Sequence, residues 1–182
     1  MFGNEKPGTA NLQEDCALHS DFCEVFEKSM QSLYLLAFLL TANHKEAEQC
    51  FVSTVEETFK GQAVFKGWVR SWVKRCLIKN AIQIVFPASA RSAKRDLWEA
   101  AKHETRRYDA IDAVTNLAPL ERFVFVMSIL ERYSGWDCSL LLGCSIKKVA
   151  VTRMRALRRR LPERHAIFPG VKSFPTRLEV TA

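Results

Sequence analysis

The sequence of 182 residues is poor in the residues that interrupt regular structure, with only 7 Gly and 6 Pro. This scarcity excludes a collagen-like chain and a low-complexity chain rich in Pro or Gly. Long apolar runs are missing too, because the nearest candidate, residues 33–40, is far shorter than the ~18–20 residues that span a bilayer. The N-terminal segment carries Glu5, Lys6 and Pro7 and has no apolar core of a secretory signal. We therefore expect a cytoplasmic protein without membrane insertion.

Signals of catalysis and of metal binding are equally sparse. The four His residues are scattered, and none of the six Cys residues forms a Cys-x-x-Cys pair. Glu56 and Glu57 are adjacent, so on a helix their carboxylates point in different directions and cannot share a substrate. Cys16, His19 and Cys23 could form part of a metal site on one helix face, but a fourth ligand is not evident. We expect free thiols, no metal, no cofactor and no enzymatic activity.

Charge is distributed very unevenly along the chain, whose formal net charge is +7. Residues 1–57 contain 3 Lys and Arg against 10 Asp and Glu. Residues 58–107 contain 12 against 3, and residues 108–182 contain 12 against 7. An acidic front followed by a basic remainder indicates two different partners, one of which is a polyanion.

Apolar residues recur with helical spacing and never alternate with period two for long enough to predict a strand. Residues 22–40 predict one or two helices that end near residues 41–43. Two later stripes follow the i, i+3, i+4, i+7 pattern. The first comprises Ala47, Cys50, Phe51, Thr54, Val55 and Thr58. The second comprises Phe65, Trp68, Val69, Trp72, Val73 and Cys76.

A small, polar and charged stretch that begins at Pro87 interrupts this pattern and predicts a flexible linker. The fold class that we expect is therefore all-α, with two small helical domains joined by that linker. The expected divisions are an N-terminal extension (1–18), a helical domain (19–86), the linker (87–108), a second helical domain (109–163) and a C-terminal tail (164–182).

The second domain has the pattern of a helix-turn-helix. Pro119 suits the first turn of a helix. The buried face of that helix is expected at Phe123, Val126, Met127 and Leu130. A short helix over 136–142 then ends at Gly143, and Ser145 can cap the next helix.

The helix after Ser145 is strongly basic, because residues 145–160 contain seven Lys and Arg and no acid. Periodicity predicts an inner face of Ile146, Ala150, Met154, Leu157 and Leu161. Base reading is expected from Lys147, Lys148, Val151 and Thr152. Contacts with the DNA backbone are expected from Arg155, Arg158 and Arg159. A solvated basic surface is the alternative interpretation of this face.

Several segments resemble bacterial sigma factors. Residues 117–127, 133–134 and 141–145, with the Arg155-Ala156 pair, are similar to region four of that family. Residues 33–41, 46–49 and 68–70 are similar to region two. Two such regions with a short linker resemble the extracytoplasmic-function (ECF) type, over about residues 20–161.

This resemblance implies that the first domain binds core RNA polymerase and opens the minus-ten element, while the helix-turn-helix binds the minus-thirty-five element of promoter DNA. Polymerase would then be contacted by Glu48, Gln49 and Ser53. Promoter DNA would be followed in the first domain by Lys66, Arg70, Lys74 and Lys79. The resemblance also allows an anti-sigma factor as a partner.

The chain departs from the family at several positions. Gln49 stands where a second acid is usual, and Lys79 stands where Asp is usual. Alignment on Val149 would shift the basic helix by one residue, and we follow the periodicity instead. Trp68 and Trp72 could stack on flipped bases, but they lie on the apolar stripe and are expected in the core. The alternative function is a sigma-derived helix-turn-helix regulator that does not recruit polymerase productively.

Overall fold

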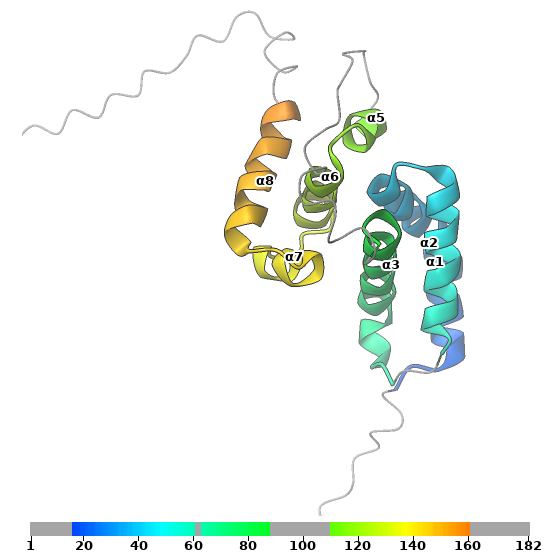
Figure 1. Cartoon of the computed structure of the whole chain (residues 1–182). Coiled ribbons are helices and arrows are strands. Elements are labelled where there is room, and N and C mark those ends of the chain that lie inside the picture. The colour runs from blue at the N-terminus through cyan, green and yellow to red at the C-terminus, as the bar shows by residue number, and fades with distance from the viewer. Residues whose placement is uncertain (1–15, 61–62, 88–109, 161–182) are drawn as a thin grey trace, which may run out of the picture.

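The computed structural model describes residues 16–60, 63–87 and 110–160, and within these ranges it is all-α (Figure 1). The extension, linker and tail expected from the sequence lie outside the described residues, except for residues 16–18 and 87. No helix in the described part is long and apolar enough to cross a membrane. The elements in chain order are α1 (His19–Thr41), α2 (His44–Thr58), the 3₁₀ helix η1 (Lys66–Trp68), α3 (Val69–Val85), α5 (Ala110–Thr115), α6 (Pro119–Phe125), the π-helical η3 (Val126–Leu130), α7 (Gly135–Leu142) and α8 (Ile146–Arg160).

The first three α-helices form a bundle, which Figure 1 shows with α3 in front of α1 and α2. α1 ends where Ala42 takes a left-handed conformation, with φ of 57°. Asn43 then caps α2, because its side chain accepts hydrogen bonds from the backbone N–H groups of Lys45 and Glu46, at 2.9 and 3.4 Å. Of the one or two helices predicted here the chain forms one, and its predicted end near residues 41–43 is confirmed.

The apolar stripe predicted on α2 is confirmed, with Ala47, Cys50, Thr54 and Thr58 buried against the rest of the bundle. Polar side chains are also buried on this face, where they have hydrogen-bond partners. The Asn80 side-chain amide of α3 donates to Thr54 Oγ1 at 3.2 Å, and Thr54 Oγ1 donates to the Cys50 carbonyl at 2.7 Å. These hydrogen bonds join α3 to α2 inside the core.

The stripe predicted around α3 is confirmed only in part. Val69, Val73 and Cys76 are buried and Trp72 is partly buried, but Trp68 is 66% exposed. The reason is that Trp68 lies in η1, before the α-helical periodicity begins at Val69. Its indole packs edge-on against the ring of Phe65, which is also exposed, with ring centroids 5.6 Å apart. The prediction that Trp68 is a core residue is therefore wrong.

α6 begins with Pro119 in its first turn, as predicted, and is buried on nearly every side. Phe123, Val126 and Met127 are fully buried, whereas Leu130, predicted on the same face, is 46% exposed. The hydrogen bonding changes at this point, since the Glu131 N–H donates to the Val126 carbonyl five residues back. The wider π-helical turn rotates Leu130 away from the face that α-helical spacing predicts.

The two halves of the described chain share one hydrophobic core. α1 packs against α5, α6 and η3, and the ring of Phe86, just after α3, lies 5.3 Å from that of Phe123 in α6. Buried residues from α1 to α8 belong to a single cluster. The described residues thus pack as one body, and a division into two separately packed domains is not seen among them.

Candidate nucleic-acid interface

The predicted helix-turn-helix consists of α7, the turn 143–145 and α8, and each boundary has a local cause. The Ser134 hydroxyl accepts a hydrogen bond from the Asp137 N–H at 3.1 Å and so caps α7. Gly143 closes α7 in the left-handed region, with φ of 61°, where a side chain would be strained. The Ser145 hydroxyl accepts from the Lys148 N–H at 3.2 Å and caps α8. The glycine turn and the serine cap predicted from the sequence are confirmed.

The face on which α8 packs differs from the prediction. Val149, Thr152 and Ala156 are buried, at 2%, 4% and 0% exposure. Ile146 and Met154, predicted to lie inside, are 47% and 53% exposed. Ala150 is exposed as well, Leu157 is partly buried, and Leu161 lies outside the described residues. The predicted inner face is therefore wrong. Val149 is buried, as the alternative alignment suggests, but Arg153, which that alignment would place inward, is exposed.

The physical reason lies in the helix against which α8 packs. Small side chains at positions 149, 152 and 156 allow α8 to lie close to α6, which is itself buried almost all round. One turn further along, Arg159 Nη1 donates to Glu121 Oε2 of α6 at 2.8 Å. Glu121 is buried, so the Arg159 guanidinium compensates a charge that would otherwise be costly. Thr152 is buried and cannot read bases in this structure, and Arg159 remains about half exposed but is paired with Glu121.

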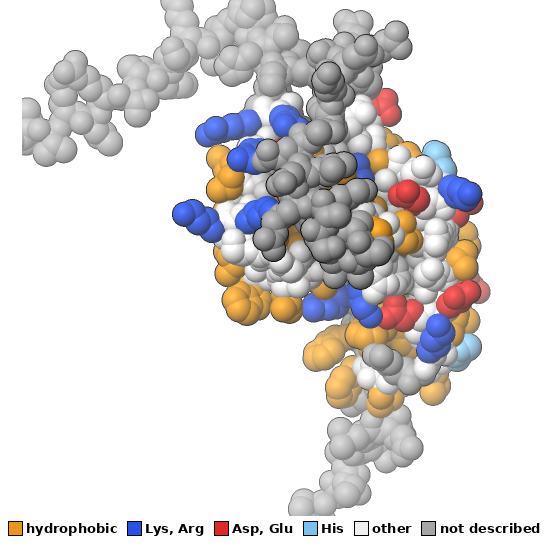
Figure 2. All heavy atoms as spheres, viewed as in Figure 1, with side chains coloured by type: hydrophobic (Ala, Val, Ile, Leu, Met, Phe, Trp, Pro, Cys, Tyr) orange, Lys and Arg blue, Asp and Glu red, His pale blue; other side chains and the backbone are white. Residues whose placement is uncertain are grey.

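The remaining predicted residues of α8 lie on its exposed side, which forms one edge of the molecule where Lys and Arg gather in Figure 2. These residues are Lys147, Lys148, Val151, Arg155 and Arg158. The exposed side also includes Arg153, which the prediction did not assign, and the side chains of Ile146 and Met154. We call this surface the basic face of α8. Cations on such a face can bind DNA phosphates, and apolar side chains such as Val151 can contact the methyl group of thymine.

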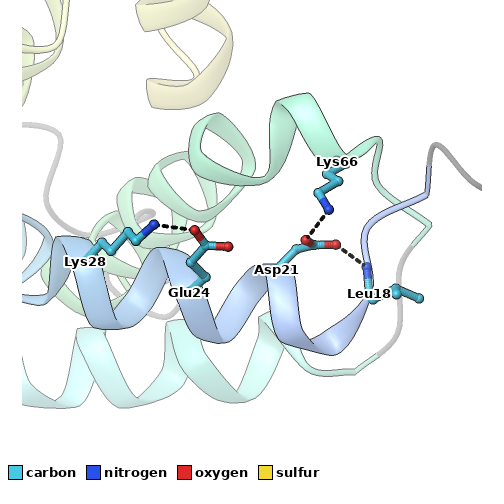
Figure 3. A network of polar contacts seen from close by, with 5 residues as sticks. All are labelled: Leu18, Asp21, Glu24, Lys28 and Lys66. Carbon is cyan, nitrogen blue, oxygen red and sulfur yellow. Dashed lines mark hydrogen bonds and ion pairs between the residues drawn. The ribbon is translucent and has the colours of Figure 1, made fainter.

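Three of the four cations predicted to follow DNA in the first half are paired with carboxylates. Lys66 Nζ lies 3.0 Å from Asp21 Oδ1 on α1, as Figure 3 shows. This hydrogen bond raises the pKa of Lys66. Asp21 also accepts from the Leu18 N–H at 2.8 Å, and these two contacts, that of Leu18 first, lower the pKa of Asp21. Lys28 and Glu24 form a second ion pair along the same helix.

The structure separates Lys79 from the other predicted cations. Lys66, Arg70 and Lys74 follow one another at four-residue intervals, whereas Lys79 is rotated by about 180° from Arg70 around α3. Lys79 Nζ instead lies 2.9 Å from Glu57 Oε1 of α2, and this hydrogen bond raises the pKa of Lys79. Lys79 therefore does not continue the line of cations formed by the other three. Arg70 is exposed on that line.

Lys74 is held by the opposite half of the molecule, with its Nζ 2.5 Å from Glu131 Oε2 in the turn after η3. Both side chains are partly buried. This contact could not be predicted from the sequence, because the two residues are 57 positions apart.

The residues predicted to contact polymerase lie on the outer face of α2. Glu48 and Gln49 are exposed and Ser53 is partly exposed. The same face includes exposed Val52 and Glu56. An acidic face with an apolar side chain in its middle has the composition of a protein-binding surface rather than of a DNA-binding one.

The described residues contain no group of three or more His, Cys, Asp or Glu that could hold a metal ion. His19 of the alternative metal site instead packs against the ring of Phe59, with ring centroids 4.3 Å apart.

Comparison with protein-family models, with curated proteins and with solved structures gives no match for this chain. Functional conclusions therefore depend on the surfaces described above.

Proposed function

We propose that the protein is a sigma factor of the ECF type, which binds core RNA polymerase and directs it to promoter DNA. The observation that carries the proposal is the basic face of α8, the second helix of a capped helix-turn-helix. Residues 145–160 themselves contain seven Lys and Arg and no acid, so a polyanion is a natural partner for this helix. In this role the N-terminal part of α8 reads base edges in the major groove, and Arg155 and Arg158 contact phosphates.

The polymerase-binding surface in this proposal is the outer face of α2. Glu48 and Gln49 lie there beside Val52, on the half of the chain whose N-terminal part is acidic. The face lies on a different helix from the cations of α3, so polymerase and DNA need not compete for the same residues. The acidic side chains of this face complement a basic docking surface on core polymerase.

A second candidate function is a sigma-derived DNA-binding regulator without productive polymerase recruitment. The observation that favours it is the pairing of Lys66, Lys74 and Lys79 with carboxylates, which weakens the first half as a DNA surface. The helix-turn-helix is not affected by these pairs. This alternative keeps DNA binding by α8 and removes the contact through α2.

Binding to core polymerase separates the two functions. The purified protein is expected to co-elute with core RNA polymerase of its source organism during gel filtration. Glu48→Lys is expected to weaken this association by about tenfold, because it reverses a charge at the centre of the proposed contact. Glu27→Lys is the matched control, since Glu27 is exposed on α1 and lies outside the proposed contact.

Transcription completes the test. Core polymerase supplied with the protein should start RNA chains at defined positions on genomic DNA, identified by sequencing the 5′ ends. DNA binding without co-elution and without defined starts would establish the regulator instead. Loss of DNA binding as well would remove both candidates.

A further inference from the structure

A cleft of about 500 Å³ lies between the start of α3 and the turn that leads into α7 (Figure 1). Pockets that bind small molecules usually measure ~300–1,000 Å³, so this cleft is large enough for one. Aromatic rings line it from both sides, with Trp68 and Trp72 on one side and Tyr133 on the other. The proposed contacts of α2 and α8 make no use of this cleft.

The rings in the cleft have surface available for a planar ligand. Trp68 is 66% exposed, and its contact with Phe65 is T-shaped, so the two rings do not cover each other face to face. Trp72 and Tyr133 are partly buried, which fixes their rings in place. Burial also raises the pKa of Tyr133, so its phenol stays neutral and can donate a hydrogen bond. A nucleobase can stack on indole rings of this kind.

The cleft also carries positive charge that the protein does not neutralise. Lys74 is paired with Glu131, the only acid among the lining residues. Within the described ranges of the chain, no carboxylate forms an ion pair with Arg75 or Arg132, which also line the cleft. Three cations against one acid give the lining residues a formal charge of +2. Two guanidiniums suit phosphate groups, which arginine can bind through two parallel hydrogen bonds.

The backbone at Arg132 is a second, independent observation. Its φ of 59° lies in the left-handed region, which favours glycine. This turn ends the helical segment formed by α6 and η3, with the Tyr133 N–H donating to the Met127 carbonyl at 2.9 Å. Glycine or asparagine is usual at such a position, so the turn itself does not require an arginine. Strained residues of this kind cluster at binding sites, and here the strain places a guanidinium at the cleft.

We propose that this cleft binds a free purine nucleoside di- or triphosphate, with the base on Trp68 and Trp72 and the phosphates on Arg75 and Arg132. A purine covers more of an indole than a pyrimidine does, because it has two fused rings. A base within a nucleic-acid strand has the same chemistry, but it brings only one phosphate. Two unneutralised guanidiniums beside one set of rings match the several phosphates of a single free nucleotide better. The site goes beyond the proposed function and does not depend on it, since neither polymerase nor promoter DNA takes part.

Isothermal titration calorimetry of the full-length protein tests the site. We expect ADP or GDP to bind saturably at one site for each chain. Adenosine or guanosine supplies the ring without phosphates, and pyrophosphate supplies the phosphates without a ring. Each of these should bind at least about tenfold more weakly than the complete nucleotide, because it makes only one of the two kinds of contact.

A single-stranded DNA dodecamer distinguishes the two sources of a nucleotide. At an equal concentration of phosphate it should not displace the bound ADP or GDP. Displacement by the dodecamer would show that the cleft takes a base from a strand and would overturn the assignment to a free nucleotide.

Arg132→Gly separates binding from folding, because it removes the guanidinium and relaxes the positive φ. We expect the affinity for the nucleotide to fall at least about tenfold, while the melting temperature stays equal to that of wild type or rises. Trp68→Leu is a second variant, at an exposed position, and should lower the affinity at least about fivefold through lost stacking. Arg70→Ala is the matched control, since Arg70 is exposed on α3 and does not line the cleft.

Three results would overturn the nucleotide site. They are the absence of binding by ADP and GDP at millimolar concentration, wild-type affinity in both Arg132→Gly and Trp68→Leu, and an equal loss of affinity in Arg70→Ala. None of them concerns DNA or polymerase, so each leaves the proposed function as it stands.

Discussion

Three of the cysteines, Cys50, Cys76 and Cys138, are buried, and burial makes their thiols hard to ionise. Burial raises the pKa of Cys50 to about 12 and that of Cys76 and Cys138 to about 11, against an ordinary value of 9.0. Cys50 also donates to the Leu77 carbonyl at 3.3 Å, which fixes its thiol between α2 and α3. These residues behave as small apolar side chains, whereas Cys23 is exposed on α1.

These raised pKa values predict how stability depends on pH. A thiol with a raised pKa in the folded state stabilises that state fully below its unfolded pKa, and the contribution is lost as pH rises toward the folded pKa. The free energy of unfolding should therefore fall as the pH rises from about 9 toward about 11, in urea titrations under reducing conditions. Cys50→Ala should make this fall shallower, because one of the thiols is gone. Cys23→Ala should keep the wild-type slope, and a shallower slope in that variant would contradict the assignment.

At the scale of the element, local signals in the sequence determined most helix boundaries. Pro119, Gly143 and Ser145 act through groups within a few residues of themselves, so their roles follow from residue type and spacing. Which side of α8 is buried could not be predicted from the sequence, because it depends on how closely α8 can approach α6. The ion pair between Arg159 and Glu121, 38 positions apart, depends on that same approach. Periodicity alone favoured the larger Ile146 and Met154 over the small residues that are buried.

The basic face of α8 gives a prediction about phosphate contacts. Replacing Arg155 and Arg158 together by Ala should weaken binding to duplex DNA of any sequence by about tenfold or more. The salt dependence should become shallower by about two counterions, since each phosphate contact releases one. Fluorescence anisotropy over a salt series measures both quantities. A Lys28→Ala variant is the control on α1, and a salt slope unchanged by the double substitution would show that these arginines do not contact the backbone.

At the scale of the whole molecule, the contacts between the two halves could not be predicted from the sequence. Arg122 and Leu40 are 82 positions apart, and Lys74 and Glu131 are 57 apart. From the sequence alone, an arginine in an apolar helix such as α6 is predicted to lie on the surface, because its carbonyl partners are known only from the structure. The uneven distribution of charge along the chain gives no information about these contacts between the halves.

Arg122→Lys tests whether the hydrogen bonds from Arg122 to the carbonyls of Leu40, Thr41, Thr115 and Leu117 join the two halves of the molecule. Burial lowers the pKa of Arg122 to about 10, so the guanidinium stays charged at neutral pH and needs its four carbonyl partners. A lysine ammonium has no planar fork and cannot serve the Leu40 and Leu117 carbonyls together. We expect the free energy of unfolding to fall by about 2–3 kcal/mol. Hydrogen exchange in urea should show α1–α3 and α6–α8 opening together in wild type and separately in the variant. Arg70→Lys, at an exposed position of α3, is the matched control, and separate opening already in wild type would show that Arg122 does not couple the halves.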